Sequence, residues 1–124
     1  MTSPNKDPSY ASAMIVDDDP ILLEVGYAAL RALGISSILR ASSGTEALQT
    51  LQSSEHQIDL IISDLQMPSM DGLTFFRALK AQDYCGALIV LSSMDDGTLS
   101  LAQNLAASQG LDVRGALPKA SSLN

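Results

Sequence analysis

Short apolar runs alternate with longer helical patterns along this chain, and this alternation is the feature that most restricts its fold. The clearest runs lie at 13–16, 58–62 and 87–91, and weaker ones lie at 36–40 and 113–117. The clear runs are apolar without strict polar alternation, which is typical of parallel strands covered on both faces. With right-handed crossovers, the pattern predicts an α/β fold with a doubly wound, five-stranded parallel sheet.

The segments between the runs carry helix signals. Pro20 suits a first helical turn with an aspartate as its cap, and Ser43 to Glu46 has the form of a capping box. Spacings of three and four then predict the side chains that face inward. In the first predicted helix these are Leu22, Val25, Ala29 and Ala32, and in the last they are Leu101 and Leu105.

Length and composition narrow the function classes. The 124 residues suffice for one domain, predicted at 11–124 after a loose polar tail at 1–10. Seven basic and fourteen acidic side chains give a net charge of −7, which argues against direct binding to nucleic acid or to an anionic membrane. A lone cysteine, Cys85, and a lone histidine, His56, exclude a disulfide framework and a multi-histidine metal site. No signal peptide or membrane-length apolar run is present, so a cytoplasmic location is expected.

Polar residues follow four of the predicted strands. They are Asp17 and Asp18 after the first, Asp64 after the third, Ser92 after the fourth and Lys119 after the fifth. The carboxyl ends of parallel strands lie at one edge of a sheet, where ligands of such folds bind. Carboxylates gathered there repel one another unless a cation intervenes, and an oxygen-only ligand set suits Mg²⁺.

Asp64 is the predicted nucleophile of this site. A carboxylate near its reference pKa is already deprotonated at neutral pH, so it attacks phosphorus without a general base. The product would be an acyl phosphate, and a lysine, a hydroxyl and a metal ion together would stabilise the incoming phosphoryl group.

With these residues in this order, the chain resembles the receiver domain of two-component response regulators, the CheY-like family. The resemblance rests on Val16-Asp17-Asp18, on the string from Ser63 to Gly72, on Leu91-Ser92-Ser93 and on Leu117-Pro118-Lys119. It covers about residues 11–119. It implies a flavodoxin-like sheet of order 2-1-3-4-5, and a phosphoacceptor rather than an enzyme.

The resemblance also implies a role for each matching residue. Asp64 would accept a phosphoryl group from a histidine kinase or a phosphotransfer protein. Asp18 and Asp64 would bind Mg²⁺ through carboxylates, Asp17 through water and Gln66 through its backbone carbonyl. Ser92 would be the switch hydroxyl, with Ser93 as a rival, and Lys119 would pair with the phosphoryl group. The change would control an output domain or a partner.

The end of the chain departs from the family pattern. The family carries a fifth helix after the lysine, and the five residues 120–124 make no more than about one turn, so this helix is expected to be missing or truncated. An uncovered sheet face predicts self-association as a homodimer, or marginal stability. The ending Gly115-x-Leu117-x-Lys119 is similar to that of receivers joined to cyclic-dinucleotide phosphodiesterase domains.

Two other functions remain open on the sequence alone. Asp17-x-Asp19 after a strand has the form found in haloacid-dehalogenase-type phosphatases, in which Asp17 would be the nucleophile and the string around Asp64 would be unexplained. The second is a degenerate receiver that serves only as a binding module, against which the intact acidic set argues.

Overall fold

The computed structural model describes residues 11–53, 57–65, 70–92 and 96–118. Strands and helices alternate through these ranges, as the sequence pattern predicts. In chain order they are β1 (Ser12–Val16), α1 (Pro20–Ala32), β2 (Ser37–Ala41), α2 (Gly44–Ser53), β3 (Leu60–Asp64), α3 (Gly72–Ala81), β4 (Ala87–Ser92), α4 (Asp96–Ser108) and β5 (Asp112–Pro118).

The five strands form one parallel sheet in the order β2-β1-β3-β4-β5. This confirms the predicted fold class and strand order. The central strand β3 pairs with β1 and β4, and its last residue, Asp64, lies beside Leu91 of β4. The described part of the chain ends with β5, so the expectation about a further helix falls on residues outside it, as do the tail at 1–10 and His56.

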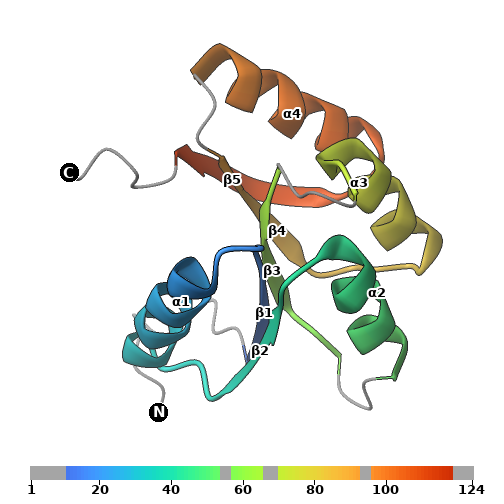
Figure 1. The fold of residues 1–124 in the computed structure, drawn as a ribbon. Coiled ribbons are helices and arrows are strands. Elements are labelled where there is room, and N and C mark those ends of the chain that lie inside the picture. The colour runs from blue at the N-terminus through green and yellow to red at the C-terminus, as the bar shows by residue number, and fades with distance from the viewer. Residues whose placement is uncertain (1–10, 54–56, 66–69, 93–95, 119–124) are drawn as a thin grey trace, which may run out of the picture.

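The two faces of the sheet carry different cores (Figure 1). On one side, here called the three-helix face, α2, α3 and α4 pack over buried side chains. This core includes Met14, Ile61, Phe75, Phe76, Leu79, Leu88 and Val90. On the other side, the α1 face, α1 packs over a smaller core. Its buried members are Ala13, Ile15, Leu30, Ile35, Leu60 and Ala87.

The inward stripe predicted for α1 is wrong. Leu23, Tyr27 and Leu30 pack into the core, whereas Val25 is 59% exposed, Leu22 is only half-buried, and the two alanines of the predicted stripe are exposed. Helix α1 is apolar on nearly every side, so spacing alone fits two different stripes. The bulkier stripe is buried because Gly26 lets the helix approach β1 closely: a Cβ at this position would lie 3.0 Å from Cδ1 of Ile15.

The inward positions predicted for α4 are also wrong. Leu101 is 59% exposed and Leu105 is 40% exposed, while Ala106 is fully buried in the core of the three-helix face. The small alanine side chain lets α4 lie close to the sheet. Successive helical residues are about 100° apart, so the neighbouring Leu105 then turns outward.

The predicted helix starts are confirmed where the structure describes them. The Asp19 side chain accepts a hydrogen bond from the Ile21 backbone N–H (2.9 Å) and caps α1. At α2, Ser43 Oγ accepts from the Glu46 N–H (3.0 Å). The Glu46 carboxylate binds Ser42, not Ser43, and accepts from its backbone N–H (2.7 Å) and its hydroxyl (2.8 Å). Among the described residues, none of the helices has the length and apolar character that crossing a bilayer requires.

Candidate functional site: an acidic cluster at the carboxyl edge of the sheet

The strand register brings distant residues together at one edge of the sheet. Val16, the last residue of β1, lies beside Ser63 on β3, and Asp64 lies beside Leu91 on β4. The Asp17 backbone N–H donates to the Ala41 carbonyl of β2 (3.0 Å), which fixes the chain just beyond β1. Positions 17, 18 and 64 therefore meet at the same edge, as the sequence predicted.

Three carboxylates form a tight cluster there. One carboxylate oxygen from each of Asp17, Asp18 and Asp64 lies within 4.8 Å of the other two. Asp17 and Asp64 are each only 1% exposed, and Asp18 is exposed. Two of the charges are therefore shielded from water by the protein, and the third opens the cluster to solvent.

The position of the two buried carboxylates follows from strand geometry. Side chains two positions apart along a strand point to the same face. Ile15 packs in the core of the α1 face and Ile62 packs against it. Asp17 comes two positions after Ile15, and Asp64 comes two positions after Ile62. Both aspartates therefore lie on the α1 face of the sheet, just beyond the apolar core of that face.

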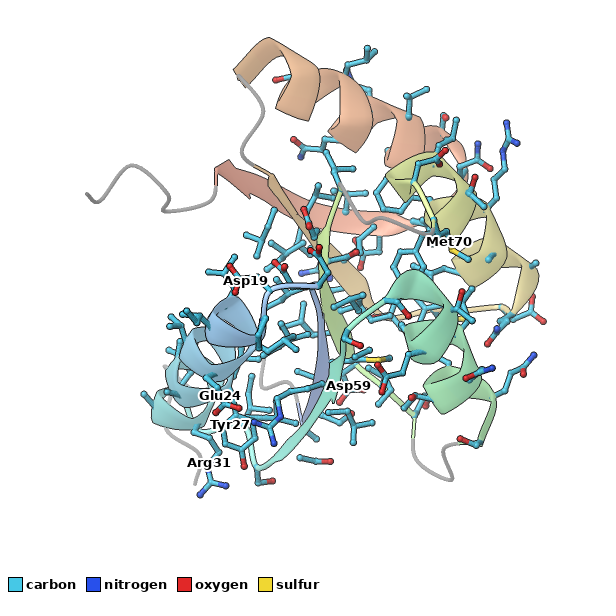
Figure 2. The ribbon with its side chains drawn as sticks, in the orientation of Figure 1. Asp19, Glu24, Tyr27, Arg31, Asp59 and Met70 are labelled. Atoms are coloured by element: carbon cyan, nitrogen blue, oxygen red, sulfur yellow. The ribbon has the colours of Figure 1, made fainter. Side chains whose placement is uncertain are left out.

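Backbone groups hold the cluster in place. The Asp19 N–H donates to Asp17 Oδ1 (2.9 Å), a local turn in which an aspartate side chain binds the backbone two residues ahead. Figure 2 shows Asp19 at the start of α1. On the sequence alone, Asp19 is predicted only as a helix cap. The signal for this second contact is the aspartate at 17, followed two positions later by a residue that has a backbone N–H. On β3, the buried Ser63 hydroxyl donates to the Asp64 carbonyl (3.0 Å).

The connection that follows β3 is closely packed where it rejoins the described chain. A Cβ on Gly72 would lie 2.6 Å from Leu65 Cδ2, so no larger residue fits there without a shift. Asp71 caps α3 by accepting from the Thr74 N–H (2.8 Å), and this hydrogen bond lowers the pKa of Asp71 below its ordinary value of 3.8.

The structure describes no side chain for four of the predicted site residues. Gln66, Lys119 and the rival switch residue Ser93 lie outside the described residues. Ser92 is the last residue of β4 and lies beside Pro118 of β5, and only its backbone is described. The register therefore puts Ser92 at the same edge as the acidic cluster.

The donor set of the cluster fits a small divalent cation. Two fully ionised carboxylates about 5 Å apart repel by roughly 3 kcal/mol at an effective dielectric of about 20, and burial of two of the three strengthens the effect. All the donor atoms are oxygens, as Mg²⁺ prefers, and the exposed side leaves room for the waters that this ion keeps. An acidic cluster at the carboxyl edge of a doubly wound sheet defines the class of protein as an α/β domain with a candidate cation site.

Comparison with known proteins identifies the family. The family model of the response regulator receiver domain matches residues 13–120, and the chain belongs to this family. A response regulator from Colwellia psychrerythraea superposes with a TM-score of 0.76 at 30% identity, over 90% of this chain and 86% of that one. The chemotaxis protein CheY4 of Vibrio cholerae has a TM-score of 0.74 at 25% identity, over 90% and 88% of the two chains.

Curated relatives are longer than this chain. The cyclic di-GMP phosphodiesterase RocR of Pseudomonas aeruginosa is 34% identical over 116 residues, which is 90% of this chain and 28% of that protein. The chain spans 37% of the probable C4-dicarboxylate response regulator DctR of Priestia megaterium. The chain thus spans less than two fifths of the length of either relative.

Proposed function

We propose that this receiver domain accepts a phosphoryl group on Asp64 and that the modified carboxylate controls an output domain or a partner protein. The observation that carries the proposal is the place of Asp64: a carboxylate that is 1% exposed, at the end of the central strand, within 4.8 Å of two further carboxylates. The three carboxylates offer only oxygen donors, which suit a hydrated Mg²⁺ ion, and a carboxylate beside such an ion is placed to accept a phosphoryl group.

The transfer needs no proton acceptor at Asp64. An oxygen of the ionised carboxylate forms a bond to phosphorus while the phosphorus–nitrogen bond of a phosphohistidine donor breaks. The leaving ring nitrogen keeps the electron pair and is stabilised by a proton. The products are an acyl phosphate on Asp64 and a free histidine on the donor, a sensor histidine kinase or a phosphotransfer protein.

The cation proposed for the site is Mg²⁺. Asp18 and Asp64 would hold it through carboxylates, Asp17 through water and Gln66 through its backbone carbonyl. When bound, Mg²⁺ neutralises the charge that develops on the phosphoryl oxygens. The Asp19 N–H holds the Asp17 carboxylate in the site, and this hydrogen bond does not require the ion.

Two further residues complete the proposed site. Ser92 ends β4 at this edge of the sheet, where its hydroxyl would donate to a phosphoryl oxygen, and Lys119 follows β5 and would pair with another. Movement of Ser92 toward the new oxygens would repack the segment between β4 and α4, and this repacking is the proposed signal.

The output is proposed from the relatives. RocR carries a receiver of this kind in a chain more than three times as long, and its name describes a cyclic di-GMP phosphodiesterase. The Gly115-x-Leu117-x-Lys119 ending agrees with such an architecture. We infer that this receiver, not itself an enzyme, works in the cytoplasm and regulates an attached or separate output module.

The phosphatase alternative makes a different prediction for the same cluster. With Asp17 as nucleophile, the string from Ser63 to Gly72 around Asp64 would have no role. The match of residues 13–120 to the receiver-domain model supports Asp64 as the nucleophile and a supporting role for Asp17.

Phosphorylation with a small donor tests the proposal. The protein is incubated with acetyl phosphate and Mg²⁺, and its intact mass is measured. A gain of one phosphoryl group is expected, and it should be absent in Asp64→Asn. Asp83→Asn, which neutralises an exposed loop carboxylate, is the control and should be labelled like the wild type. Labelling that survives Asp64→Asn unchanged but disappears in Asp17→Asn would instead support the phosphatase reading.

A further inference from the structure

Helix α1 presents a second apolar face, away from the sheet. Ile21 is 71% exposed and Val25 is 59% exposed, and three alanines of the same helix are exposed as well: Ala28, Ala29 and Ala32. These residues and the half-buried Leu22 form one continuous stripe along the helix, called here the outer face of α1. Of the four helices that the structure describes, α1 is the one on its side of the sheet (Figure 1). A contiguous apolar surface of this kind marks an interaction site.

Charged residues border this outer face along one side only. Glu24 and Arg31 are seven positions apart, so they lie on the same side of the helix, two turns from each other. Figure 2 shows both on α1, near Tyr27. Glu24 is 69% exposed although it accepts from Arg40 NH1 (2.6 Å), and Arg31 is exposed and donates to the Tyr27 hydroxyl (3.5 Å).

We propose that the outer face of α1 is a homodimer interface in which the α1 helices of two copies pack antiparallel. The order of the charges specifies this direction. In an antiparallel helix pair, the same flank of both helices comes together, so Glu24 of each copy lies opposite Arg31 of the other. A parallel pair would place this flank against the opposite one, which carries no charge, and neither residue would gain a partner.

The sizes of the side chains fit the same arrangement. In the antiparallel register that pairs Glu24 with Arg31, Ile21 of one helix lies opposite Ala32 of the other. Val25 then lies opposite Ala28, and Leu22 lies opposite Ala29. Each large side chain meets an alanine, so the two helices pack closely without voids. Size and charge thus select the same occupant, a second copy of this chain.

This surface is distinct from the α1 face of the sheet, because it lies on the side of α1 that points away from the strands. It also does not depend on phosphorylation of Asp64. A single pair of 13-residue helices, each about 20 Å long, forms a small interface, so the dimer is expected to be weak and concentration-dependent.

Sedimentation velocity of the whole chain over micromolar to millimolar concentrations tests the proposal. The wild type should shift from monomer toward dimer, and Val25→Glu should weaken association at least about tenfold. Leu101→Glu is the matched control, because Leu101 is also 59% exposed but lies on α4. Purely monomeric wild type, or equal loss of association in both variants, would overturn the proposal.

A charge exchange supplies the sharper test. Glu24→Arg or Arg31→Glu alone places like charges together twice in a symmetric dimer, and each should weaken association severalfold. The double variant is made in an Arg40→Ala background, because Arg40 lies 2.6 Å from Glu24 within one copy and would repel an arginine at position 24. There the exchange restores both contacts between copies with reversed polarity and should recover the association of the Arg40→Ala protein. Arg40→Ala, which removes only the partner of Glu24 within one copy, separates loss of that contact from loss of the interface, and it should dimerise at least as well as the wild type. Failure of the double variant to recover would contradict the antiparallel pairing.

Discussion

Two adjacent residues of β3 point to opposite faces of the sheet and are buried to different extents. Ile61 is fully buried in the core of the three-helix face, whereas Ile62 points to the α1 face and is half-buried. The same contrast recurs on β4, where Leu88 is fully buried and Ile89 is half-buried. Within the described residues, three helices cover one face and a single helix covers part of the other.

The difference shows how stability and function are divided. The acidic cluster lies at the end of the α1 face, on strands whose other face is anchored by a well-packed core. The core of the three-helix face fixes β1 and β3 from one side, and this anchoring holds Asp17 and Asp64 in position at the strand ends.

The largest expected effect comes from truncating the two neighbouring isoleucines. Ile61→Ala leaves a cavity in a closed core and should destabilise the protein by about 3–5 kcal/mol, and Ile62→Ala, at a half-buried site, should cost about 1–2 kcal/mol. The chemical change is identical, so urea unfolding midpoints compare the faces directly. Equal losses would mean that the α1 face is as well covered as the other.

Neutralising the acidic cluster should stabilise the protein. Asp64→Asn relieves repulsion with two nearby carboxylates, and because Asp18 is exposed to water we expect a gain of about 1–2 kcal/mol in metal-free buffer. Added Mg²⁺ should raise the thermal midpoint of the wild type more than that of the variant. Asp83→Asn changes the net charge equally and should leave stability unaltered. A less stable Asp64→Asn protein would show that the contacts of the Asp64 carboxylate outweigh its repulsion from the neighbouring carboxylates.

Sequence reasoning located the site better than it located the helix faces. Strand ends follow from where apolar runs stop, and parallel strands put those ends at one edge, so the convergence of Asp17, Asp18 and Asp64 could be predicted without coordinates. The order of strands and helices and capping residues such as Asp19 could also be predicted, because each depends on residues that are close together in the sequence.

The orientation of α1 and α4 could not be obtained in this way. Helix α1 has two apolar stripes, and the buried one was decided by the close approach at Gly26, a tertiary contact with Ile15. On α4, the small Ala106 rather than the large Leu101 or Leu105 faces the core. Helical spacing favours large apolar side chains as the inward ones, and it carries no information on how much space there is between the helix and the sheet.

Two helical glycines sharpen the comparison between the faces at smaller cost. A Cβ on Gly44 of α2 would lie 2.8 Å from Met70 Sδ and 3.3 Å from Phe75, so Gly44→Ala should lose about 1–2 kcal/mol on the three-helix face. On the α1 face, a Cβ on Gly26 would lie 3.0 Å from Ile15 Cδ1, a side-chain tip that can turn aside, and 3.5 Å from Cγ2, an ordinary contact distance, while Gly26→Ala gains up to about 1 kcal/mol of helix propensity. It should therefore be no less stable than the wild type by thermal unfolding. The opposite order of the two variants would reverse the assignment of the tighter face.

The smallest expected effect is a loss of stability at acidic pH that arises from two carboxylates on the three-helix face. Hydrogen bonds from the backbone and hydroxyl of Ser42 lower the pKa of Glu46 below its ordinary value of 4.5, and the Thr74 N–H lowers that of Asp71 below 3.8. Both carboxylates bind fewer protons in the folded protein than in the unfolded chain. Their contribution is therefore complete above the unfolded pKa values and is lost as pH falls through the folded ones. The urea unfolding midpoint of the wild type should therefore fall between pH 5 and pH 3, and this fall should be smaller than the fall caused by any of the core substitutions.

Glu46→Gln and Asp71→Asn should each flatten that decline, and Asn keeps the ability to cap α3. An unchanged slope in both variants would place the acid sensitivity elsewhere, with the acidic cluster at the end of the α1 face as the next group to examine.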